Sequence, residues 1–196
     1  ADLTTGIDTG IEGLRIGIAR GFFFAEADPE VAALVRAAAE ELARLGARVD
    51  EIDVPGAERT HEAVNTLVRA EVYALHRERL ADAPERFGAE VLRRLRLTES
   101  IEGADVADAI HAGRVWTRTV DRLLEQVDLV LSPTTSVPAP LASDPDMIET
   151  TRLLTQLTYA WSLSGTPSIS VPVGFTAAGL PIGMQLAGRR WDDATL

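Results

Sequence analysis

The hydrophobic positions of the chain change period several times, and each change marks a new element. Short apolar or alternating runs, which are typical of strands, occupy 14–19, 47–55, 128–132, 167–175 and 180–188. Between these runs apolar residues recur every three or four positions, which predicts helices over 29–45, 57–80, 84–97, 104–127 and 144–163. Because strands and helices alternate, the pattern predicts an α/β fold with a mixed β-sheet flanked by helices.

The first predicted helix carries clear start and stop signals. Asp28, Pro29 and Glu30 supply a capping acid, a proline in the first turn and a negative charge at the positive helix end. Gly46 follows the last apolar position, as a glycine that ends a helix does. The helix therefore connects two strands, and such units place the strands in parallel with a right-handed crossover.

Composition and charge exclude several classes of protein. With 46% hydrophobic and 25% charged residues over 196 positions, the chain is expected to form a single α/β unit over 1–196. No apolar run is long enough to span a membrane. A net charge of −11 disfavours nucleic-acid binding, although Arg93–Arg96 ("RRLR") form one local basic cluster. The absence of cysteine fits a cytoplasmic protein.

The basic residues restrict the chemistry that this chain can perform. All 19 of them are arginine, so no lysine can act as a general base or form a Schiff base. His61, His76 and His111 fall in predicted helices, without the spacing of a metal site or the elbow motif of a serine hydrolase. Acids at 144, 146 and 149 are typical of a helix start rather than of a calcium loop. We therefore expect no catalytic residue, no metal and no cofactor within this chain.

One loop combines stiffness with hydroxyl groups. The stretch "LVLSPTTSVPAP" (129–140) runs from a buried strand directly into prolines, threonines and serine. Binding sites of α/β proteins gather beyond the ends of the strands, and threonine hydroxyls can both donate to and accept from an amide. A surface loop whose hydroxyls cap nearby backbone is the alternative interpretation.

Three stretches together resemble the C-terminal half of an amidase signature enzyme. They are "GLRIGIARG" with the helix and strand that follow it, "DLVLSPTTSVPAP" (128–140), and the long closing segment "LSGTPSISVPVGFTAAGLPIGMQLAGR" (163–189). The resemblance implies the C-terminal half of the amidase signature fold, similar to the A chain of the glutamyl-tRNA amidotransferases. It also implies a hydrolase that cleaves a carboxamide C–N bond through a serine, a second serine on a cis peptide and a lysine.

Those three catalytic groups belong to the N-terminal half of the family, and this chain contains no lysine. The resemblance therefore implies that the chain is a piece of a larger amidase domain and supplies walls of its substrate pocket. Its expected partners are a small-molecule amide, the missing N-terminal half and, through an exposed sheet edge, further copies of itself in a homo-oligomer. The alternative is a non-catalytic binding or assembly module that reuses the same α/β half.

The resemblance also points to individual substrate-binding residues. Thr134 and Thr135 lie in the loop after the third strand, and Trp161 and Ser162 precede the Gly-x-Pro turn. Arg94 matches an arginine that holds a substrate carboxylate in members that use glutamine, because a guanidinium binds a carboxylate in bidentate geometry. Thr98 and Thr155 depart from the glutamine pattern, which has glycine and an acid at these places, and both departures argue against glutamine. Gln185 is expected to be structural and satisfied by backbone groups.

Overall fold

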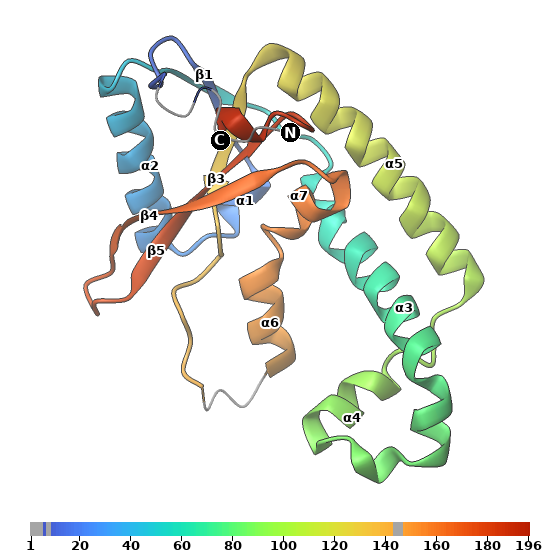
Figure 1. Cartoon of the computed structure of the whole chain (residues 1–196). Helices are drawn as coiled ribbons and strands as arrows, with labels where there is room; N and C mark the ends of the chain where they lie inside the picture. Colours follow the sequence, from blue (N-terminus) through green and yellow to red (C-terminus); the bar gives the residue numbers. More distant parts are fainter. Residues whose placement is uncertain (1–5, 7–8, 143–146) are drawn as a thin grey trace.

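The structure is a computed structural model that describes residue 6, residues 9–142 and residues 147–196. Five strands form one sheet in the order β2-β1-β3-β5-β4. The first three pair in parallel, whereas β5 runs antiparallel to both of its neighbours. The predicted mixed sheet is therefore confirmed (Figure 1). The strands are β1 (Arg15–Ala19), β2 (Arg48–Ile52), β3 (Leu129–Pro133), β4 (Ser168–Phe175) and β5 (Pro181–Gly188).

Helices account for most of the remaining described residues. The α-helices are α1 (Phe22–Ala25), α2 (Pro29–Arg44), α3 (Thr60–Asp82), α4 (Ala89–Arg96), α5 (Gly103–Gln126), α6 (Met147–Thr155) and α7 (Tyr159–Ser164). Short 3₁₀ turns cover Ala57–Arg59, Pro84–Arg86 and Asp193–Thr195. Among the described residues, no helix has the length and apolar character needed to cross a membrane.

The first strand–helix–strand unit forms as its start and stop signals predict. The side chain of Asp28 accepts a hydrogen bond of 2.8 Å from the backbone N–H of Glu30, which caps α2. Gly46 ends the helix at a φ of 104°, a left-handed conformation that side chains with a Cβ rarely adopt. Strands β1 and β2 are therefore parallel neighbours, with α2 connecting them.

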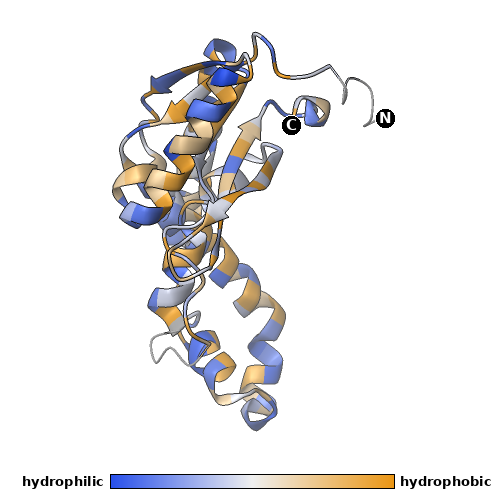
Figure 2. Cartoon of the chain, turned by 90° about the vertical axis from the view of Figure 1, so that its left-hand side faces the viewer, coloured by the Kyte–Doolittle hydropathy of each residue, from blue (hydrophilic) through white to orange (hydrophobic). Residues whose placement is uncertain are grey.

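The two faces of the sheet bury different clusters. On one face, α2 packs its apolar side against residues of β1, β3 and β5, including Leu131 and Leu186. Figure 2, in which α2 faces the viewer, shows hydrophilic and hydrophobic residues alternating along this helix. On the other face, Val130 and Ala187 pack against aromatic and aliphatic residues of α1, α5 and α7. The sheet is thus a central layer between two layers of helix.

The helices α3, α4 and α5 form an arm that extends away from the sheet (Figure 1). The long helices α3 and α5 pack against each other and both contact α7, which ties the arm to the sheet. Trp116 of α5 donates its indole N–H to the carbonyl oxygen of Ala160 in α7, at 2.5 Å. The arm and the sheet are therefore joined through one buried aromatic contact region.

The helix predicted over 144–163 is wrong as a single element. Its expected start at 144–146 lies outside the described residues, and the remainder divides into α6 and α7 around a turn at 156–158. Thr155 and Thr158 donate their hydroxyls to backbone carbonyls three or four residues earlier, at 2.8 and 2.9 Å. Such bonds compete with the helical ladder and favour a break. The helix expected over 84–97 likewise begins with a 3₁₀ turn before α4.

Candidate functional site

A cavity of about 600 Å³ lies between the arm and α6. Its wall is made by one face of α3, the segment from Phe87 through α4, the inner face of α6 and the first residue of α7. The cavity has the size of a small-molecule site. Its lining residues are His61, Asn65, Val68, Arg69, Val72, His76, Phe87, Val91, Arg94, Leu95, Leu97, Thr98, Ile148, Glu149, Thr151, Arg152, Thr155 and Tyr159.

The arginines of this cavity are bound by neighbouring groups of the chain. Arg94 donates from Nε to Glu90 at 3.0 Å and from a terminal nitrogen to the hydroxyl of Thr151 at 3.1 Å. Arg152 binds Glu149 in bidentate geometry at 2.8 and 2.6 Å. Hydrogen bonds from Arg93 and Arg94 lower the pKa of Glu90 to about 2. The Glu90 carboxylate is therefore ionised throughout the neutral range.

Aromatic rings line the cavity beside these ion pairs. The rings of His61 and Tyr159 stack with centroids 5.4 Å apart and planes inclined by 16°, and those of His76 and Phe87 meet edge to face at 5.8 Å. Burial lowers the pKa of His61, and the positive charge of Arg152 lowers it further. His61 is therefore a neutral ring at neutral pH and adds little charge to the cavity.

Two positions singled out in the sequence meet in this cavity. Arg94 and Thr155 both line it, although they lie on α4 and α6. The hydroxyl of Thr155 donates to the backbone carbonyl of Thr151 at 2.8 Å, so its hydrogen is directed into its own helix. Thr98 is buried, and its hydroxyl bonds the carbonyl of Leu95.

The loop after β3 holds the two predicted threonines in different ways. The hydroxyl of Thr134 lies 2.7 Å from that of Ser170 in β4, whereas Thr135 donates to the carbonyl of Val137 within the loop at 2.8 Å. A Cβ at Gly183 would lie 2.7 Å from the Ser170 hydroxyl and 2.9 Å from that of Thr134. Glycine at this position therefore permits the close approach of the three strands.

Polar side chains continue across the sheet from this hydroxyl pair. Ser132, Gln185 and Ser170 lie in register on three neighbouring strands. The expectation that backbone groups satisfy Gln185 is wrong, because its amide nitrogen donates to the hydroxyl of Ser168 at 3.1 Å. Within the described part of the chain, Ser132 Oγ and Gln185 Oε1 are buried without a hydrogen-bond partner. Both atoms remain able to accept a hydrogen bond.

A buried chain of hydrogen bonds connects the cavity to this loop. Arg152 donates to Gln156 Oε1 at 2.5 Å, and Gln156 Nε2 donates to Ser136 Oγ at 2.7 Å. The carbonyl of Ser136 in turn accepts from the backbone N–H of Asp28 at 2.7 Å, at the start of α2. Gln156 and Ser136 are 2% and 0% exposed, so the cavity wall and the loop are fixed relative to each other.

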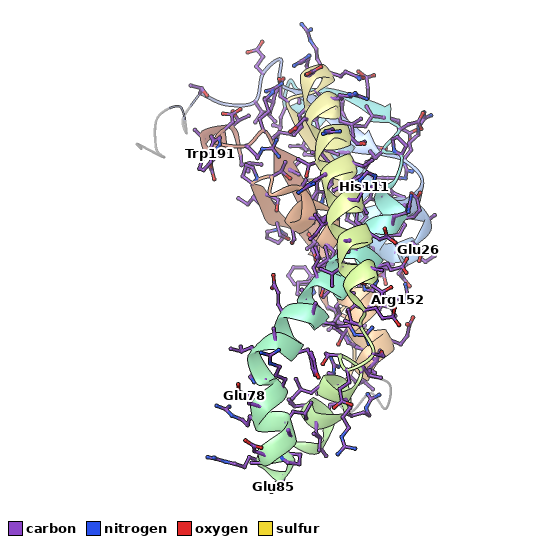
Figure 3. The ribbon with its side chains drawn as sticks, turned by 90° about the vertical axis from the view of Figure 1, so that its right-hand side faces the viewer. Glu26, Glu78, Glu85, His111, Arg152 and Trp191 are labelled. Atoms are coloured by element: carbon purple, nitrogen blue, oxygen red, sulfur yellow. The ribbon has the colours of Figure 1, made fainter. Side chains whose placement is uncertain are left out.

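Trp161 and Ser162 lie apart from the cavity. The ring of Trp161 is buried and stacks on Phe23 at 5.4 Å, so most of it belongs to the core. Both residues border a depression of about 380 Å³ that also contacts Trp191. Figure 3 shows Trp191 near one end of the molecule and Arg152, which marks the cavity, near its middle. The five predicted substrate-binding residues therefore occupy three places: the cavity, the loop and this depression.

The sequence interpretation missed Gln156, Ser136 and Ser170, which connect these places. A polar residue four positions after Arg152 on the same helix was a signal for Gln156. Ser170 belongs to an alternating strand, where polar positions usually face solvent, so it gave no signal of its own. In the described residues, no group of three histidine, aspartate or glutamate side chains is arranged to hold a metal ion.

Comparison with known proteins identifies the family. The family model described as Amidase matches residues 3–196. The chain is 34% identical to the A chain of the glutamyl-tRNA(Gln) amidotransferase of Myxococcus xanthus, over 100% of this chain and 45% of that protein. It is 31% identical to an amidase of Pseudomonas putida, over 97% of this chain and 42% of that protein. It therefore spans less than half the length of these relatives.

Solved structures agree with this assignment. The A chain of the glutamyl-tRNA(Gln) amidotransferase from Thermotoga maritima superposes with a TM-score of 0.80 and 26% identity, covering 97% of this chain and 42% of that one. A vestigial protein complex that bears on the origins of an s-triazine catabolic enzyme superposes with a TM-score of 0.86 and 27% identity, covering 96% of this chain and 42% of that one. The chain belongs to the amidase signature family and is homologous to the C-terminal part of these longer enzymes.

Proposed function

We propose that this chain forms the substrate-pocket part of an amidase. The enzyme would cleave a carboxamide C–N bond by a serine, cis-serine and lysine mechanism whose three residues lie outside these 196 positions. The observation that carries the proposal is the cavity, in which Arg94 and Thr155 meet although they lie on separate helices. The chain contains no lysine, so the base must come from elsewhere.

The chemistry of the described residues suits binding rather than bond cleavage. The cavity can hold the body of a small amide by apolar contact and so orient its carbonyl towards a nucleophile. The loop at Thr134 can present hydroxyl groups to the amide, because its partner Ser170 leaves further donor and acceptor capacity on both oxygens. The bonds from Arg152 through Gln156 to Ser136 would keep the cavity and the loop in a fixed relation during turnover.

The alternative, a non-catalytic binding or assembly module, is favoured by one observation. Ser132 Oγ and Gln185 Oε1 have no partner in the described part of the chain and could receive donors from another polypeptide. A catalytic N-terminal half would also supply such donors, so this observation alone does not separate the two proposals. Activity of the joined halves does separate them.

The test joins this chain to the N-terminal region of the Pseudomonas putida amidase, co-expressed or fused, and measures hydrolysis of simple amides. We expect turnover from the pair. Thr134→Val should then raise KM more than it lowers kcat, since a residue that only binds substrate acts mainly on KM. Thr119→Val is the matched control, because Thr119 lies on α5, away from the cavity and the loop, and donates to the carbonyl of Val115 in its own helix. Folded but inactive pairs would favour the assembly module.

We also propose that the protein is cytoplasmic and that it self-associates through β4. This strand lies at the edge of the sheet and exposes Ile169 and Phe175 by 40% and 69%. Unprotected edge strands pair readily with other chains. Light scattering over a concentration series should show a dimer or larger species, and a monomer at every concentration would contradict this proposal.

A further inference from the structure

We infer that the cavity selects a neutral amide with an aromatic or branched apolar body and disfavours amides that carry a carboxylate. This inference rests on the proposed function, because it names the substrate class of the same cavity. It is carried by two observations: the guanidinium groups of the cavity are already engaged by the chain, and the remaining wall is largely apolar.

Arg152 has little capacity left for a ligand. Two of its nitrogens bind the two oxygens of Glu149, and the third binds Gln156. Bidentate recognition of a carboxylate needs two parallel N–H groups on one edge of the guanidinium. All three nitrogens of Arg152 already donate to the protein, so an anionic ligand would have to displace Glu149.

Arg94 and Arg69 are engaged in a similar way. On Arg94, Nε binds Glu90 and a terminal nitrogen binds Thr151. Arg69 donates to the backbone carbonyl of Leu97. Bidentate capture of a carboxylate through the Nε edge of Arg94 would therefore break its ion pair with Glu90. The Glu90 carboxylate would then repel the incoming anion.

The rest of the wall favours an apolar body. Val68 and Val91 are 43% and 51% exposed from α3 and α4, which leaves apolar surface available to a ligand. The stacked pair of His61 and Tyr159 adds flat aromatic surface, and Ile148 closes the side formed by α6. Covering this surface with an aromatic or branched group removes apolar area from water on both partners. A charged ligand gains nothing comparable here.

The test is binding of three amides to this chain, followed by methyl NMR of valine, leucine and isoleucine. We expect benzamide to shift the methyl signals of Val68, Val91 and Ile148 in a saturable manner. Glutamine and succinamate should cause no saturable shift at the same concentrations. Val68→Glu should weaken benzamide binding at least tenfold. Val115→Glu makes the same chemical change at a residue of α5 that is 49% exposed and outside the cavity lining, and it should leave binding unchanged.

Glu90→Gln tests the cause of the selectivity. Removing this carboxylate frees Arg94 from its ion pair, so succinamate affinity should rise at least fivefold while benzamide affinity stays within twofold. If Val68→Glu fails to fold, as judged by circular dichroism, Val91→Glu replaces it. Glutamine or succinamate binding the unaltered chain as tightly as benzamide would overturn the selectivity and leave the pocket proposal standing. Absence of binding by all three amides would overturn the pocket proposal itself.

Discussion

The two faces of the sheet differ in how completely the described residues satisfy them. On the α2 face, Leu131 and Leu186 belong to a continuous apolar cluster. On the opposite face, Val130 and Ala187 are apolar, but two residues along the strands from them Ser132 and Gln185 bury oxygens without partners. A buried polar atom without a partner costs about 1–3 kcal/mol. The comparison teaches that one face is complete in itself, whereas the other retains unused binding capacity where the predicted hydroxyl loop begins.

The largest expected effect is on the complete face. Leu131→Ala should lower the free energy of unfolding by about 2–5 kcal/mol, because the side chain is fully buried and its removal leaves a cavity. Urea denaturation measures this loss. Leu75→Ala is the control, since Leu75 is 77% exposed on α3, and it should change stability by less than about 0.5 kcal/mol. Equal losses in the two variants would contradict the distinction between core and surface.

A smaller loss is expected where a buried hydroxyl is used. Ser136→Ala should cost about 1–3 kcal/mol, because it leaves the buried amide nitrogen of Gln156 without its acceptor. The same denaturation series measures it. Shifts in the methyl signals of Ile148 should accompany the loss, since Gln156 also holds Arg152 beside the cavity. An unchanged cavity spectrum would contradict the connection between loop and cavity.

An ion pair at the base of the sheet should contribute less and depend on pH. Hydrogen bonds from Arg15, whose side chain is 42% exposed, lower the pKa of Asp128 well below its usual range, and Arg189 adds to this effect. A lowered folded pKa means that the stabilisation is present above about pH 4, the unfolded value, and is lost as the pH falls further. Asp128→Asn should therefore cost about 1–2 kcal/mol at neutral pH and flatten the acid loss of stability.

Denaturation midpoints between about pH 2 and pH 7, a range that spans the titration of aspartate, measure this prediction. The control is Asp53→Asn, because Asp53 pairs with Arg20 while 77% exposed and should contribute almost nothing. Parallel pH curves for the original chain and Asp128→Asn would refute the assignment of the acid sensitivity to Asp128.

The smallest expected effect sharpens the comparison most. Ser132→Ala should change stability by no more than about 0.5 kcal/mol, because its hydroxyl is buried without a partner and its loss removes an unsatisfied group. Ser132 and Ser136 are both 0% exposed, so burial is matched and only hydrogen bonding differs. A cost for Ser132→Ala as large as that for Ser136→Ala would show that both hydroxyls are satisfied in solution.

Local signals predicted much of the fold, whereas long-range contacts decided the site. The capping acid at Asp28 and the glycine at Gly46 were sufficient for α2, and alternation was sufficient for the strands. The break between α6 and α7 depends on threonine hydroxyls and on where Gln156 finds its partner, which sequence spacing does not reveal. For the same reason, Arg94 and Thr155 were named in the sequence, but their common cavity became evident only in the structure.

The central claim is that this chain binds an amide and leaves catalysis to residues outside it. The most direct measurement is amide hydrolysis by the purified chain alone, assayed against simple aromatic and aliphatic amides beside a buffer blank. We predict a rate equal to the blank, because an unactivated serine is inert at neutral pH and the chain has no lysine to activate one. Turnover by the chain alone that disappears in Ser132→Ala or Ser164→Ala would contradict the account.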